Sequence, residues 1–206
     1  MVTRGRLDLA IVAYRRALEL EPLSPYILWD LAWELMHVRR YGEALPLIER
    51  AATLTPTGSS RLSLRRARLL LELGRKPEAE VALRAYLESP RTGSDPQIAN
   101  EAVWCLQVLG SPADRERWTA ELLRQYPDSF AGGVILLMLG REAEAYPLLE
   151  KFPTIFWQQL YWEPAFDPVR DTPRFQQLLE KLGCAAEYKV ARETLGRIQN
   201  ENAPKK

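Results

Sequence analysis

Two prolines that stand 34 residues apart, Pro22 and Pro56, bracket the most constraining stretch of this chain. Residues 24–56 between them read as two amphipathic helices joined by a short turn. A fixed period of this length is typical of arrays of helical hairpins. Because a lone hairpin cannot bury its apolar stripe, the spacing predicts several stacked units.

Apolar residues recur at helical spacing along almost the whole chain, and no segment alternates convincingly as a strand. Near the start, Leu7, Ala10 and Ile11 fall on one helical stripe. Pro25 suits the first turn of the next helix, and Ser24 is the residue expected to cap it. We therefore expect an all-α fold.

Small residues recur where paired helices would touch, with a glycine or polar turn between the helices and a proline near the end of each unit. The turn appears as Tyr41-Gly42-Glu43-Ala44, then as Leu73-Gly74 and Leu139-Gly140. In this register residues 5–153 resemble the tetratricopeptide repeat family. The resemblance implies a right-handed superhelical solenoid of antiparallel helix pairs. The implied units are a half repeat at 5–22 and repeats at about 24–56, 59–90, 95–127 and 129–153, the last with a first helix shortened after Gly132-Gly133.

After Pro153 the sequence becomes rich in proline and aromatic residues. It resembles the segment that closes tetratricopeptide arrays in many bacterial multidomain regulators and signalling proteins. We expect a helical cap at 154–200, with its aromatic residues buried rather than forming a ligand pocket, and a disordered tail at 201–206. Asp171 or Thr172 would cap its helix, and Ser94 or Asp95 would cap an earlier one. The matching positions are Pro164, Phe166, Pro168, Val169, Arg170, Pro173, Arg174, Phe175, Leu178 and Leu179.

The chain starts in the second helix of a unit, so the inward face of residues 7–20 has an incomplete partner. Removal of upstream sequence explains this better than a covering molecule does. Self-association through this helix is a weaker alternative.

Composition argues against several classes of partner. The formal net charge is +1, which gives no electrostatic reason to bind nucleic acid or an anionic membrane. The apolar runs are too short to cross a bilayer, and the N-terminus does not read as a signal peptide. Cys105 and Cys184 fit thiols in a reducing compartment, so we expect a cytoplasmic protein.

Catalytic signals are weak. A single histidine, His37, excludes a multi-histidine metal site. No serine stands in a nucleophile-elbow context, and Gly132-Gly133 lacks the strand and lysine of a phosphate-binding loop. We expect no enzyme activity, no cofactor and no metal.

In the family, the first helices of the units line a concave groove. Carried over by register, the groove is aromatic at one end, basic in the middle, and amide plus aromatic at the other end. The arginines recur at i, i+4 and i+7, although a solvated face or packing between helices would explain them equally well. The candidate groove residues are Tyr26, Trp29, Asp30, Trp33, His37, Arg61, Arg65, Arg68, Asn100, Trp104 and Gln107.

This pattern favours a scaffold that binds a peptide carrying an acidic group. Trp29 and Trp33 stand where the family's chaperone-binding clamp needs a lysine and an asparagine, so chaperone binding is not predicted. The alternative is the regulatory or sensory region of a bacterial transcription regulator or signalling enzyme. Charge reversal of Arg65 and Arg68 together should abolish partner binding without unfolding the array.

Overall fold

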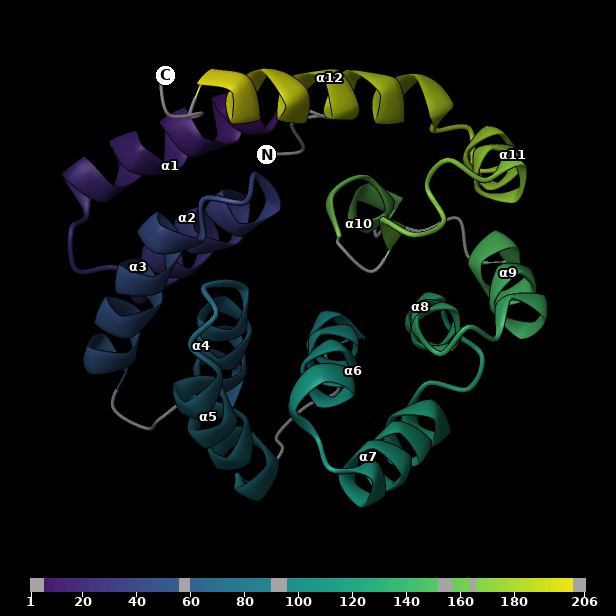
Figure 1. Cartoon of the computed structure of the whole chain (residues 1–206). Helices are drawn as coiled ribbons and strands as arrows, with labels where there is room; N and C mark the ends of the chain where they lie inside the picture. The colour runs from purple at the N-terminus through teal and green to yellow at the C-terminus, as the bar shows by residue number, and fades with distance from the viewer. Residues whose placement is uncertain (1–5, 56–59, 90–95, 152–156, 164–165, 202–206) are drawn as a thin grey trace. The chain divides into compact units, whose positions relative to one another are not determined.

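The computed structural model describes residues 6–55, 60–89, 96–151, 157–163 and 166–201. Every regular element in these ranges is a helix, which confirms the all-α helical repeat (Figure 1). The helices are α1 (Leu7–Leu20), α2 (Pro25–His37), α3 (Tyr41–Leu54), α4 (Ser60–Glu72), α5 (Lys76–Glu88), α6 (Pro96–Leu109), α7 (Pro112–Gln125), α8 (Phe130–Met138), α9 (Glu142–Lys151), α10 (Trp157–Trp162), α11 (Pro173–Lys181) and α12 (Ala185–Glu201).

The chain folds into two compact units. The first unit joins Met1–Ser89 to Glu187–Lys206, and the second is Pro90–Ala186. Helix pairs α2–α3 and α4–α5 pack closely in the first unit, as do α8 and α9 in the second. The predicted division into four and a half repeats plus a cap stays a prediction. The structure groups most of α12 with the N-terminal helices.

The start of the inward face of α1 is covered. Leu7, Ala10 and Ile11 are all buried, and α2 packs along α1. Helix α12 lies beside α1 in Figure 1, where the Arg197 guanidinium donates to the Asp8 carboxylate over 2.8 Å. The start of this face is therefore covered by helices of the same chain, whereas Tyr14, Ala17 and Leu18 farther along it are half-buried. Self-association through this helix stays a prediction.

Three hairpin turns share one backbone geometry. Gly74, Gly140 and Gly183 follow α4, α8 and α11 with φ of 74°, 73° and 69°. The N–H after each glycine donates to the carbonyl five residues earlier, over 2.8 Å from Arg75. This left-handed backbone suits glycine, which has no Cβ to clash. The turn after α2 has the same geometry with Arg39 at φ 64°.

Substituting alanine at Gly74 should cost about 1–2 kcal/mol of stability, because the left-handed backbone penalises any Cβ. A Cβ there would meet no atom within 4 Å, so the cost comes from the backbone alone. Gly196→Ala in α12 is the matched control, since that site is equally open and shows no positive φ. It should raise stability by about 0.5–1 kcal/mol. Urea unfolding of both variants tests this, and effects of the same sign would contradict it.

The residue after each of three turns is an arginine that pairs with a glutamate three positions later. Arg75 donates to Glu78 over 2.7 and 2.6 Å, and the arginines before α3 and α9, Arg40 and Arg141, make the same bond. Hydrogen bonding from its arginine lowers the pKa of Glu78 and likewise that of Glu144. Each pair thus holds a carboxylate in the first helical turn, where the helix dipole favours negative charge.

Helix α8 is short, as predicted, with 9 residues, but it starts at Phe130 and contains both glycines, whereas the sequence led us to expect a start after them. The Ser129 hydroxyl caps it by accepting from the Gly132 N–H over 3.0 Å. A Cβ on Gly132 would lie 2.2 Å from the Tyr126 carbonyl oxygen, and one on Gly133 would lie 2.9 Å from Leu149. The glycines therefore permit close packing on both sides of α8.

The segment around α11 packs as expected. The Phe166 and Phe175 rings lie 5.8 Å apart, and both are fully buried together with Leu178. Thr172, rather than Asp171, caps α11 by accepting from the Phe175 N–H over 3.3 Å. These two aromatic side chains therefore fill a core.

Predictions at other helix ends had mixed outcomes. Ser24 is the capping residue of α2 by position, but its side chain makes no capping hydrogen bond. Ser94, Asp95 and residues 202–206 lie outside the described residues, whereas Glu201 ends α12.

Candidate functional site

The predicted groove residues fall in both units. Eight of them lie on α2 and α4 of the first unit. Asn100, Trp104 and Gln107 lie on α6 of the second unit, where Asn100 is buried and the other two are half-buried. The structure therefore brings the aromatic and basic residues together as one candidate site on α2 and α4.

The centre of this site is a guanidinium that lies against two indoles. The Arg65 Cζ atom lies 4.5 Å from the centroid of the Trp29 ring and 3.7 Å from that of Trp33. The Arg65 Nη1 also lies 3.7 Å from the Met36 sulfur, and the side chain is 1% exposed. A buried cation against two aromatic faces is a strong form of the cation–π interaction. Arg65 thus joins α4 to α2.

His37 extends this stack. Its ring meets the Trp33 ring edge-on at 4.5 Å between centroids, and its Nδ1 lies 3.6 Å from a Glu34 carboxylate oxygen. His37 and Arg68 are both buried. The histidine therefore packs in the seam between helices, as the simpler interpretation of the sequence had it.

The acidic residue of the predicted groove interacts with α1. Burial raises the pKa of Asp30 above its ordinary 3.8, although a hydrogen bond with Tyr14 acts in the opposite direction. Burial first, and then the charges of Asp30 and Glu34, raise the pKa of Tyr14 to about 12. The phenol therefore stays protonated near neutral pH and can donate to the Asp30 carboxylate.

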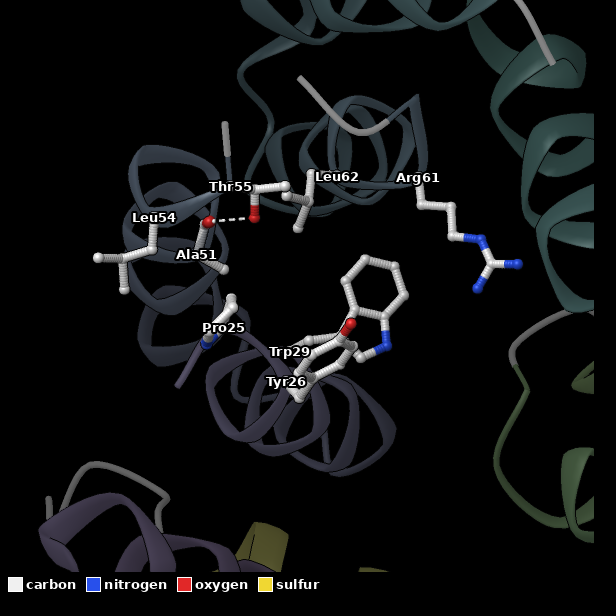
Figure 2. Close-up of a pocket in the computed structure, with 8 residues that line it drawn as sticks. All are labelled: Pro25, Tyr26, Trp29, Ala51, Leu54, Thr55, Arg61 and Leu62. Carbon is white, nitrogen blue, oxygen red and sulfur yellow. Dashed lines mark hydrogen bonds between the residues drawn. The ribbon is translucent and has the colours of Figure 1, made fainter. Parts of the chain in front are cut away.

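A pocket of about 410 Å³ opens beside the stack, where α2, the end of α3 and the start of α4 meet. Figure 2 shows the Trp29 indole projecting into the space between the three helices, with the Arg61 guanidinium at its edge. Three predicted groove residues line it. The described residues that line it are Pro25, Tyr26, Trp29, Ala51, Leu54, Thr55, Arg61 and Leu62.

The sequence missed the α3 side of this pocket. In the repeat register only the first helix of each unit lines the groove. The second helices were expected to support it from behind, so Ala51, Leu54 and Thr55 were not predicted to contact a ligand. Their position at the end of α3, just before Pro56, was the available signal. A helix end that faces the gap before the next hairpin is open to a ligand, even where the helix body is not.

Three further features of the described residues bear on function. They contain no group of three His, Cys, Asp or Glu side chains placed to hold a metal ion. Cys105 and Cys184 are buried thiols. In the part of the chain that the structure describes, no helix has the length and apolar character needed to cross a membrane.

Comparison with known proteins identifies the repeats. Tetratricopeptide repeat models match residues 2–59 and residues 35–100. Residues 2–100 are therefore similar to tetratricopeptide repeats. No curated protein matches the chain. Both matches end before α7, so the similarity of the C-terminal segment to bacterial regulators stays a prediction.

Two solved structures are similar at low sequence identity. One is YrrB, a tetratricopeptide repeat protein with an unusual peptide-binding site, at 15% identity over 88% of this chain and 96% of YrrB, with a TM-score of 0.46. The other is BtubC (BKLC) from P. vanneervenii, at 16% identity over 98% of this chain and 92% of BtubC, also with a TM-score of 0.46.

Proposed function

We propose that the chain is a non-catalytic scaffold whose first unit binds a peptide or partner segment across α2 and α4. One observation carries this proposal. The two helices place Tyr26, Trp29 and Arg61 in the lining of an open pocket, and Arg65 packs behind it against Trp29 and Trp33. Aromatic and arginine side chains are the residues that contribute most to binding at protein interfaces.

The arginines of α4 take different parts in this site. Arg61 is exposed at the pocket edge, whereas Arg65 and Arg68 are 1% and 4% exposed. A guanidinium binds a carboxylate through two parallel hydrogen bonds, and this needs access to the ligand. Arg61 therefore makes the direct contact with an acidic group, while Arg65 holds the aromatic wall in place.

Charge reversal at Arg61 is the corresponding test. A partner captured from native cells by the immobilised wild-type chain should bind Arg61→Glu at least about tenfold more weakly, because attraction becomes repulsion. Arg84→Glu on α5 is the matched control, since Arg84 is exposed and does not line the pocket. Purified partner and titration calorimetry give the affinities. Equal affinities for wild type, Arg61→Glu and Tyr26→Ala would overturn the proposed binding face.

A further inference from the structure

We infer that the pocket between α2, α3 and α4 is an anchor subsite for one bulky apolar side chain of an acidic partner peptide, with Arg61 binding a carboxylate beside that side chain. The inference rests on the proposed function and names the chemistry of the partner. Four observations support it: the size of the pocket, the apolar character of its walls, the fixed position of Trp29, and the charge of Arg61 at its edge.

The pocket has the size of a subsite. Its volume of about 410 Å³ falls at the lower end of the range of about 300–1,000 Å³ for ligand sites. It therefore suits one or two side chains. The ends of three helices form it, so an occupant would contact both the α2–α3 hairpin and the start of α4.

The walls favour an apolar occupant. Pro25, Leu54 and Leu62 contribute hydrocarbon surface, and Trp29 contributes an aromatic face. Two hydroxyls belong to the described lining. That of Tyr26 is on a largely exposed side chain, and that of Thr55 donates to the Ala51 carbonyl over 2.8 Å (Figure 2). Because this hydroxyl proton is used within α3, a polar occupant would lose hydrogen bonds to water without full replacement.

The aromatic wall is held in position before a ligand arrives. Trp29 lies against the Arg65 guanidinium, and that guanidinium also lies over the Trp33 ring. A fixed side chain loses little conformational entropy on binding, so more of the contact energy appears as affinity. Arg65 is therefore a positioning residue for the pocket and makes no contact with the peptide.

The edge of the pocket selects for negative charge. Arg61 is the single charged side chain among its eight lining residues, and it is exposed. Tyr26 stands beside it with 81% of its surface exposed, an unusual state for so large an aromatic side chain. An occupant with an aromatic ring followed by a carboxylate would cover Tyr26 and pair with Arg61.

Capped dipeptides test the inference on the full chain by NMR. Acetyl-Phe-Asp-amide should bind with a Kd of about 1 mM and shift the signals of Trp29, Thr55 and Leu62. Acetyl-Ala-Asp-amide should bind at least about tenfold more weakly, since it lacks the apolar anchor. Acetyl-Phe-Asn-amide should bind about threefold more weakly and lose the salt dependence of binding.

Variants separate this inference from the proposed function. Arg61→Glu should remove the preference for Asp over Asn, and Arg84→Glu should keep it. Arg65→Met should weaken binding of the Phe-Asp probe, because Trp29 is held less firmly, while the preference for Asp over Asn remains.

Equal binding of the Phe and Ala probes, or NMR shifts confined to residues outside the pocket, would overturn the inference. If the native partner still depends on Arg61 while the probes fail to discriminate, the subsite fails and the binding face stands. If the native partner ignores Arg61 and Tyr26, the proposed function fails.

Discussion

Arg65→Glu is expected to unfold the first unit, with a loss of about 3–5 kcal/mol of stability. The substitution puts a carboxylate between two indole faces, whose electrons repel an anion just as they attract the guanidinium. The site is 1% exposed, so water cannot compensate the new charge. This argues against the expectation from the sequence that charge reversal of Arg65 and Arg68 leaves the array folded.

Two companion variants isolate the charge. Arg65→Met keeps a flexible stem between Trp29 and Trp33 and should cost about 1–2 kcal/mol, the approximate value of a buried cation–π contact. Arg84→Glu reverses an exposed charge on α5 and should leave stability unchanged. Urea unfolding with hydrogen exchange of the α2 and α4 amides measures all three. An Arg65→Glu variant as stable as Arg65→Met would show that the stack does not depend on its charge.

The sequence predicts most of the helices because their signals are local. Glycine turns, proline spacing and apolar stripes each act within a few residues, and they predict the hairpins around Gly74 and Gly140. The same signals gave the wrong start for α8. A glycine pair usually weakens a helix, but here the backbone of Tyr126 approaches so closely that only glycine fits.

The roles of the site residues were harder to predict, because residues of the same type take different roles according to their tertiary contacts. Arg61 and Arg65 lie one turn apart on one helix face, and nothing local distinguishes them. In the structure Arg65 lies against the two indoles of α2 and is buried, whereas Arg61 is exposed. The position of α12 beside α1 is hidden for the same reason, since the contact between Asp8 and Arg197 spans 189 residues.

The C-terminal proline-rich segment contains another buried arginine, with a different role. Arg170 is 3% exposed, and its guanidinium donates to the Leu160 carbonyl, to the Glu163 carbonyl over 2.7 Å and to the Asp167 carboxylate over 2.7 Å. Gln176 in turn donates to the Arg170 carbonyl over 2.7 Å. The side chain thus satisfies backbone acceptors at the end of α10, where the helix supplies no donor of its own.

Arg170→Met is therefore expected to cost the second unit about 3–5 kcal/mol. It leaves two buried carbonyls without their donor, each worth about 1–3 kcal/mol, and leaves Asp167 without its charge partner. Arg170→Lys should cost less, because one ammonium can replace part of the network but cannot fork between Leu160, Glu163 and Asp167.

Hydrogen exchange of the α10 and α11 amides in each variant measures the loss where it occurs. Arg124→Met on α7 is the control, since Arg124 pairs with Glu121 on an exposed face and its loss should not be measurable. If Arg170→Met protected α10 as well as the wild type does, the carbonyls of Leu160 and Glu163 would have found other donors. Arg170 would then fill space between α10 and α11 without stabilising their contact.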